Sequence, residues 1–285
     1  MLLRRLASLL AVLPSLPLAL AHAEAPLPAA RLPGPDHPLR VCADPNNLPF
    51  SNAAEAGFEN EVARLVAEEM EAPLVYEWWA QRRGFIRNTL KAGTCDVVIG
   101  VPAGYELVET TRPYYRSGYV WVYPRARGLD LRDITDPRLR ELKIGVHLIG
   151  DDGSNTPPAH ALGQQGIVDG VHGYLIYGDY RSADPAAEPV RAVARGEVDV
   201  AAVWGPLGGY FARSAAIPLA VMPISETGEF APLRFRFAIA MGVRHGDEEL
   251  RAALDGILAR REGDITAILA RYGVPLMPAR ERNVP

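Results

Sequence analysis

The chain has 285 residues, with 30 basic and 34 acidic side chains and a formal net charge of −4 at neutral pH. This balance argues against a nucleic acid or an anionic membrane as the partner, because both attract basic surfaces. The length exceeds what one compact core usually covers, so we expect two lobes.

The N-terminus has the features of a secretory signal peptide. Arg4 and Arg5 precede an apolar run over residues 6–20, and small residues then lead to Ala23. A retained membrane anchor is the alternative, but two prolines break the run, which is too short to span about 30 Å of hydrocarbon. We predict a signal peptide over residues 1–23, cleaved after Ala23, and no membrane span in the exported chain. Residues 24–38, rich in proline and alanine, are predicted to be a leader tail.

The first half of the exported chain alternates strands and helices. Strands are predicted at 39–43, 74–79 and 96–101, and helices at 58–70 and 85–90. Helix 58–70 carries apolar residues at helical spacing, while strand 96–101 is an unbroken apolar run typical of a strand buried on both faces. This alternation predicts parallel pairing with right-handed crossovers.

The second half repeats the pattern. Strands are predicted at 143–149, 171–177 and 199–204, helices at 159–165 and 187–195, then a strand at 234–242 and helices at 247–260 and 264–272. The strand at 199–204 resembles the one at 96–101, and a short helix with a glycine precedes each. Two similar α/β halves fit the length better than one large sheet.

The chain has two cysteines, Cys42 and Cys95. A signal peptide directs the protein to an oxidising compartment, where we expect them to form one disulfide. Two buried, reduced thiols are the alternative.

Several ordered motifs resemble extracellular solute-binding proteins of the polar-amino-acid type. They are Leu39-Arg-Val-Cys-Ala-Asp-Pro, Leu48-Pro-Phe-Ser, Gly57-Phe-Glu, Lys91-Ala-Gly-x-x-Asp-Val-Val-Ile, Pro113-Tyr-Tyr and Gly196-Glu-Val-Asp-Val. The resemblance implies the periplasmic binding protein type II fold, with two α/β lobes of mainly parallel sheets around a cleft. Two crossing strands, near residues 121–127 and 223–234, would form the hinge. Lobe 1 would comprise residues 39–122 and 234–285, and lobe 2 residues 123–233.

The chain departs from this class at two ligand positions. Amino-acid binders usually hold the ligand carboxylate with an arginine after the third strand of the first lobe, where this chain has Val101-Pro-Ala-Gly-Tyr105. They hold the ligand amine with an aspartate, where this chain has Trp204. A zwitterion would leave desolvated charges unpaired, so the usual mode of amino-acid binding is not expected.

A narrower family accommodates these departures. Thr110-Thr-Arg-Pro-Tyr-Tyr-Arg-Ser, Gly145-Val-His-Leu-Ile-Gly-Asp-Asp-Gly-Ser-Asn-Thr-Pro-Pro and Val203-Trp-Gly-Pro-Leu resemble the quinoprotein-dehydrogenase-associated binding-protein-like proteins of the MxaJ/XoxJ type. This resemblance implies a periplasmic accessory protein that binds a PQQ-dependent methanol dehydrogenase, calcium- or lanthanide-type, and assists its maturation or activation. The alternative is a carrier of a small solute such as PQQ to an enzyme or ABC transporter.

Candidate cleft or partner-binding residues lie where strands should open onto the cleft. The loop Asp151, Asp152, Ser154, Asn155 and Thr156 follows a buried strand and is either a binding loop or a turn that caps its own backbone. The other candidates are Asp44, Asn46, Asn47, Phe50, Trp79, Arg82, Arg83, Phe85, Tyr105 and Trp204. The aromatics would suit a flat ring or an inserted segment, or else belong to the core, and the two arginines would clamp a carboxylate or lie solvated on the surface.

The sequence contains no pattern that predicts catalysis. Nucleophile-elbow, P-loop and nucleotide-binding glycine motifs are missing, and the histidines and cysteines lack metal-ligand spacing. We therefore predict neither an enzyme nor a resident cofactor or metal.

Overall fold

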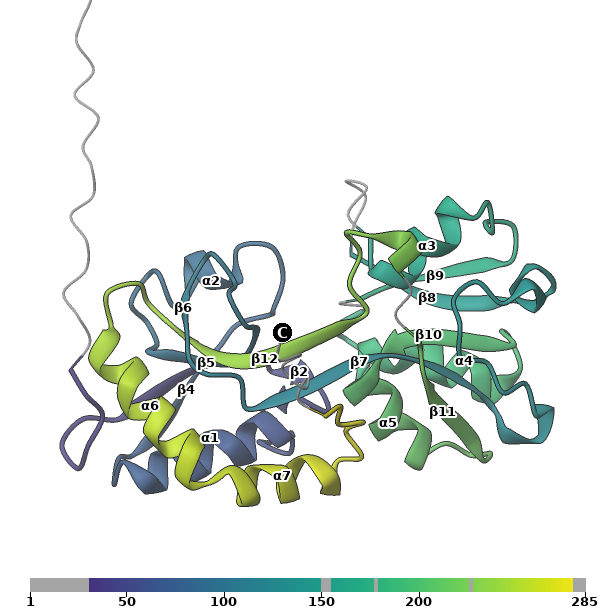
Figure 1. Ribbon diagram of the computed structural model, residues 1–285. Coiled ribbons are helices and arrows are strands. Elements are labelled where there is room, and N and C mark those ends of the chain that lie inside the picture. The colour runs from purple at the N-terminus through teal and green to yellow at the C-terminus, as the bar shows by residue number, and fades with distance from the viewer. Residues whose placement is uncertain (1–30, 150–154, 177–178, 226–227, 279–285) are drawn as a thin grey trace, which may run out of the picture.

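The computed structural model describes residues 31–149, 155–176, 179–225 and 228–278. Figure 1 shows two α/β lobes joined by the long strands β7 (Tyr115–Pro124) and β12 (Arg236–Val243). The predicted signal peptide and the candidate residues Asp151, Asp152 and Ser154 lie outside the described residues. Within the described ranges, no helix is long and apolar enough to cross a membrane.

The first lobe combines the N-terminal part of the chain with its end. Its strands are β1 (Leu39–Ala43), β2 (Asn46–Asn47), β3 (Ser51–Asn52), β4 (Leu74–Trp78), β5 (Val97–Pro102) and β6 (Glu109–Thr110), and its helices are α1 (Phe58–Glu69), α2 (Phe85–Asn88), α6 (Glu248–Arg260) and α7 (Glu262–Arg271). The main sheet runs β4-β1-β5-β12, with β1 parallel to both neighbours and β12 antiparallel to β5. The predicted parallel pairing therefore holds for the first three strands.

The second lobe is formed by the middle of the chain. Its strands are β8 (Ile144–Leu148), β9 (Val171–Leu175), β10 (Val200–Trp204) and β11 (Leu219–Pro223), and its helices are α3 (Pro157–Gln164), α4 (Glu188–Arg195) and α5 (Gly205–Arg213). Short 3-10 turns occur at Arg125–Arg127, Pro137–Glu141, Pro185–Ala187 and Gly228–Phe230. The sheet runs β7-β10-β8-β9, with β11 also paired to β7.

Strand β7 belongs to both lobes. Residues 115–118 pair with β12, and residues from Tyr119 onward pair with β10 and β11. The chain thus crosses between lobes at Gly118 and Tyr119, a few residues before the predicted crossing at 121–127. The strands of both lobes form one continuous hydrogen-bonded path through β12 and β7, so strand pairing alone does not mark where one lobe ends. The predicted boundary between residues 122 and 123 therefore stays a prediction.

Each lobe has its own apolar core. In the first, α1, α6 and α7 pack on one face of the sheet, and buried side chains such as Phe58, Val66, Met241 and Leu254 fill the space between them. The second lobe has a cluster on each face of its sheet, one including Trp121 and Leu162 and the other including α4 and α5 side chains. Burying one such leucine contributes about 2 kcal/mol, so these layers hold the cleft walls in place.

Helix α5 was not predicted from the sequence, because three glycines in its nine residues disfavour a helix. Packing explains the glycines. A Cβ at Gly209 would lie 2.0 Å from the carbonyl oxygen of Gly273, just after α7. Glycine therefore permits the close approach of α5 to the end of the first lobe, and tertiary contact outweighs local propensity.

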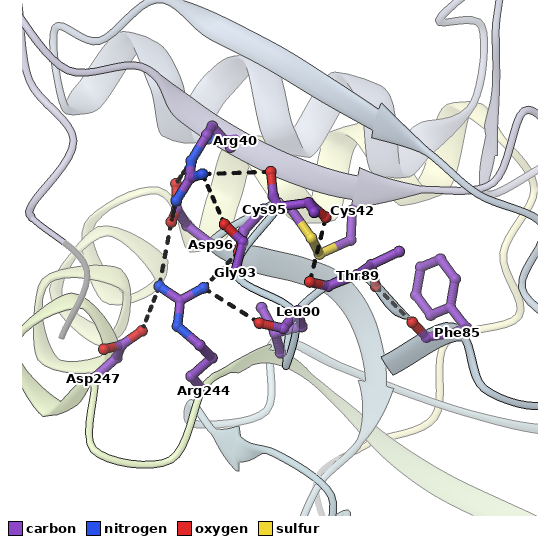
Figure 2. The surroundings of a disulfide bond; sticks show 11 residues. Arg40, Cys42, Phe85, Thr89, Leu90, Gly93, Cys95, Asp96, Arg244 and Asp247 are labelled. Atoms are coloured by element: carbon purple, nitrogen blue, oxygen red, sulfur yellow. Dashed lines mark hydrogen bonds and ion pairs between the residues drawn. A yellow bond between two sulfur atoms is a disulfide. The ribbon is translucent and has the colours of Figure 1, made fainter. Parts of the chain in front are cut away.

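The predicted disulfide between Cys42 and Cys95 is confirmed, with the Cα atoms 5.4 Å apart (Figure 2). It links β1 to the turn before β5. Beside it, Arg244 lies between Asp96 and Asp247, with nitrogen–oxygen distances of 3.4 and 3.0 Å. Arg40 contacts the same carboxylate oxygen of Asp96, Oδ1, at 2.6 Å. We call these four paired residues the arginine–aspartate network.

Candidate functional site: the cleft between the lobes

A cleft of about 390 Å³ lies between the two lobes. Such a volume lies within the range of small-molecule sites. Its described lining is mostly apolar and aromatic and consists of Asn47, Phe50, Glu59, Gln81, Gly100, Val101, Pro102, Tyr115, Tyr119, His147, Ile176, Ala186, Trp204, Leu207, Phe237 and Ile239. Both lobes and both crossing strands contribute to it, so a change in lobe angle would change the shape of the cleft.

Trp204 occupies the wall of the second lobe at the end of β10. Its ring packs edge-to-face on Tyr119 at 5.5 Å and on Phe237 at 5.8 Å between centroids. These neighbours come from the two crossing strands. The position where amino-acid binders have a carboxylate is therefore part of an aromatic cluster at the hinge.

The opposite ligand position is equally apolar. Val101 and Pro102 at the end of β5 line the cleft, and none of the described lining residues is an arginine or a lysine. The cleft wall thus offers no fixed positive charge to a ligand carboxylate.

Glu59, in the first turn of α1, is the acidic residue of this lining. Burial, reinforced by the negative charge of Asp44, raises its pKa to about 8, although part of the side chain remains accessible from the cleft. Its carboxylate packs against the bare backbone of Gly100, where a Cβ would lie 2.0 Å from Oε1. Gly100 thus leaves room for the acid, which is mostly protonated at neutral pH.

His147 lines the cleft from β8. It is buried, and its Nε2 donates to the carbonyl oxygen of Ala186 at 3.0 Å. Burial lowers the pKa of His147 to about 4, although the bond to that carbonyl favours the charged form. The ring is neutral at pH 7. Its bond to the backbone of the same lobe is typical of a structural histidine.

Three residues of the first lobe, Asp44, Asn46 and Arg82, contact Tyr180 and Ser182 of the second lobe. We call these five residues the interlobe clasp. The Tyr180 hydroxyl donates to Asp44, and the guanidinium carbon of Arg82 lies 4.5 Å from the centre of the Tyr180 ring. Asn46 Nδ2 donates to the carbonyl oxygen of Ser182 at 2.9 Å. These contacts join the lobes at loops outside the two crossing strands.

The structure distributes the predicted site residues over several places. Asn47, Phe50 and Trp204 line the cleft. Asp44, Asn46 and Arg82 are engaged in the clasp, where Asp44 also accepts from the Gln81 backbone at 2.6 Å. Trp79, Arg83 and Tyr105 are exposed outside this lining. Their binding roles stay predictions.

The remaining predicted residues have structural contacts. Phe85 is buried with Ile86, Leu90 and the disulfide rather than facing the cleft, because the apolar start of α2 covers that bond. Thr156 is buried, and its hydroxyl donates to the His147 carbonyl at 2.7 Å. The Asn155 backbone donates to His160 Nε2 at 3.3 Å. Here the loop bonds to its own lobe.

Sequence reasoning missed Glu59, Tyr119 and Phe237 as cleft residues. Tyr119 and Phe237 lie on the crossing strands, whose inward faces depend on the register between lobes. Glu59 follows directly after the matched Gly57-Phe58 pair, so its place in a recognised motif was the available signal.

Among the described residues, no group of three or more histidine, cysteine or acidic side chains is arranged to hold a metal ion. Aromatic rings and the carboxyl of Glu59 are the prominent binding groups of the described cleft lining.

Comparison with known proteins places this architecture. The family model for bacterial extracellular solute-binding proteins, family 3, matches residues 39–275. Protein MoxJ of Methylorubrum extorquens is 33% identical over 252 residues, covering 84% of this chain and 82% of MoxJ.

Two solved structures share the fold over their whole length. Periplasmic binding protein XoxJ from Methylobacterium extorquens AM1 is 35% identical, with a TM-score of 0.70, and covers 85% of this chain. MxaJ from Methlophaga aminisulfidivorans MPT is 27% identical, with a TM-score of 0.73, and covers 84% of this chain. All of each solved chain is matched. The fold is therefore the two-lobed α/β fold of periplasmic binding proteins, and the chain belongs to the bacterial extracellular solute-binding proteins, family 3.

Proposed function

We propose that this chain is a periplasmic accessory protein that binds a PQQ-dependent methanol or alcohol dehydrogenase and assists its maturation or activation. The observation that carries the proposal is the cleft wall, where Val101, Pro102 and Trp204 replace the charged clamp of amino-acid binders. Similarity to MoxJ, XoxJ and MxaJ supports the same role, which is the one that the family resemblance of the sequence motifs implies.

The geometry suits a clamp on a protein segment. An aromatic cleft gains free energy mainly by removing apolar surface from water, and this requires no zwitterion. The lobes are linked by β7 and β12 and by the interlobe clasp. Breaking the clasp while the crossing strands bend would open the cleft to an exposed segment of the dehydrogenase and later release it.

The first experiment measures binding of the mature protein to the dehydrogenase of the same organism, apo and PQQ-loaded, by interferometry. We expect saturable binding, weakened at least about tenfold in Trp204→Ala, because a buried tryptophan at an interface centre commonly contributes that much. Val168→Ala, an exposed apolar position of the same lobe, is the control. Absence of binding to both forms would refute the proposal.

The maturation step has its own test. A strain lacking this protein should produce dehydrogenase with lower activity per unit of enzyme protein. Normal specific activity in that strain would contradict a role in maturation even if the two proteins bind.

A carrier function is the second candidate, and the cleft volume of about 390 Å³ favours it. In this case the free solute, with PQQ as the first to try, would bind without the dehydrogenase. Calorimetry at saturating PQQ tests the carrier function for this solute. A heat of PQQ binding, together with no binding of the dehydrogenase, would favour the carrier.

A further inference from the structure

Among the described residues, the lining of the cleft combines aromatic rings with a single acid, Glu59. Phe50, Tyr115, Tyr119, Trp204 and Phe237 supply the rings, and no described lining residue carries a permanent positive charge. Ring faces attract cations through their quadrupole, and a carboxylate supplies the counter-charge. Few other ligand groups satisfy both features at once.

We propose that the cleft binds an organic ammonium group carried on an apolar body, with Glu59 as its counter-ion and the aromatic rings as its cage. The inference rests on the proposed function and deepens it, because a lysine side chain or a free amino terminus of the partner protein carries this group. A small apolar amine is the other source of the same chemistry.

The charges around the cleft disfavour an anion. Glu59 lies near Asp44, and both are acids. Arg82, the nearby predicted carboxylate clamp, is stacked on Tyr180 in the interlobe clasp. A carboxylate in the cleft would lose its water without gaining a fixed cation, which is costly. These charges disfavour PQQ, a tricarboxylate, as the ligand of this site, and the calorimetric titration with PQQ tests that preference.

Binding of an ammonium group exchanges one proton. In the empty cleft Glu59 is largely neutral at pH 7, because its pKa is about 8. When the ammonium enters, the carboxyl releases its proton to solvent and keeps the negative charge, while the ammonium stays protonated. The surrounding ionisable groups are Asp44 after β1, Tyr76 on β4, Tyr114 before β7, Tyr115 on β7, and His147 on β8, which is neutral at this pH.

Three probes of similar shape test the charge preference by calorimetry: 2-phenylethylammonium, neutral 2-phenylethanol and anionic 3-phenylpropionate. We expect the ammonium to bind at least about tenfold more tightly than the others at pH 8. Its affinity should fall about tenfold per pH unit below pH 8, because the fraction of Glu59 that is ionised falls tenfold per unit and only the ionised form pairs with the ammonium. Parallel titrations at pH 7 in two buffers of different ionisation enthalpy should report release of close to one proton.

The variants assign the effect to Glu59. Glu59→Gln should lose at least about tenfold in ammonium affinity and all proton release, with an unchanged far-ultraviolet spectrum. Glu249→Gln, an exposed position on α6, should change neither. Equal affinities for the three probes, or unchanged ammonium binding in Glu59→Gln, would overturn the inference.

A competition experiment separates the two sources and the two proposals. If 2-phenylethylammonium displaces the dehydrogenase, the partner itself supplies the ammonium group. If the amine binds but does not displace the dehydrogenase, the ligand is a free amine. If the dehydrogenase binds while no amine does, the accessory function stands and the ammonium site is wrong.

Discussion

The arginine–aspartate network and the cleft both adjoin β5, but they differ in how a buried acid is surrounded. The acid of the network is paired with arginines, whereas the acid of the cleft is not. In the network, Asp96 has two arginine partners, and Arg244 also donates to the Cys95 carbonyl at 2.6 Å. In the cleft, Glu59 faces aromatic rings and Asp44, and its pKa rises to about 8. Each charged group of the network has an opposite charge beside it within the fold, whereas Glu59 has no basic side chain among the described lining residues of the cleft.

The contrast suggests a structural role for the arginine–aspartate network and a binding role for the acid in the cleft. The paired charges beside the disulfide lie within the first lobe, and removal of one partner would leave a buried charge uncompensated. A neutralised acid at a cleft wall costs stability, and such a cost is typical of a binding site.

Arg244→Met should have the largest effect. It removes the guanidinium that pairs with Asp96 and Asp247 and donates to the Cys95 carbonyl, and we expect a loss of about 3–5 kcal/mol in the free energy of unfolding. Urea denaturation measures this loss. Arg64→Met, whose pair with Glu55 is exposed, should cost less than about 1 kcal/mol. Equal losses for the two variants would mean that the buried network contributes no more to stability than an exposed ion pair.

Removal of the disulfide comes next. Cys42 and Cys95 are 53 residues apart in sequence, so the Cys42→Ala, Cys95→Ala double variant should lose about 2–4 kcal/mol through greater freedom of the unfolded chain. Chemical denaturation checks this, and a reducing agent should destabilise the wild type but leave the double variant unchanged. A wild type insensitive to complete reduction would contradict the prediction.

Glu59→Gln should change how stability depends on pH. The unfolded chain loses this proton near pH 4.3, whereas the folded protein keeps it until about pH 8. Between these values the unfolded state binds fewer protons, so the wild type loses stability as pH rises, and the loss is complete above about pH 8.

The size of this effect is on the order of 2 kcal/mol after allowance for the partial exposure of the side chain. The Gln variant should lack this part of the pH dependence, measured as unfolding free energy between pH 5 and 9. Glu249→Gln should retain the wild-type profile. Parallel profiles for all three proteins would mean that Glu59 is ionised in the folded protein.

The smallest effect is expected at the interlobe clasp. Tyr180→Phe removes the hydroxyl that donates to Asp44 but keeps the ring under Arg82, so stability should change by only about 1 kcal/mol. Small-angle scattering should show a larger mean radius of gyration, because open forms become more populated. Tyr174→Phe, on β9 in the same lobe, is the control. An unchanged scattering profile would show that the clasp does not hold the lobes together.

The sequence predicted the strands with strong local signals. Continuous apolar runs mark β5, β8 and β10, and their observed bounds differ from the predicted ones by one residue or so. Strand β7 was recognised only as a crossing, because its two halves pair with different lobes and no local pattern reports that. The Cys42–Cys95 bond followed from compartment rather than geometry.

The site was less predictable, because its properties arise from long-range contacts. Trp204, Asn47 and Phe50 could be placed at strand ends by resemblance. The position of Glu59 depends on Gly100, 41 residues away, and the chemistry of its carboxyl depends on burial that the sequence does not display. Asp44 and Arg82 were predicted as cleft or partner-binding residues, and both contact Tyr180 of the other lobe, which the sequence does not reveal.

The order of segments along β7 and β12 has a consequence for biogenesis. The strands and helices of the second lobe lie within one continuous stretch, whereas the first lobe needs β12, α6 and α7 from the end of the chain. As the chain emerges, one apolar face of the N-terminal strands therefore stays uncovered until the C-terminal helices that pack on it are available. The second lobe can complete its core earlier, so the lobe that carries Glu59 and the disulfide is the last to form.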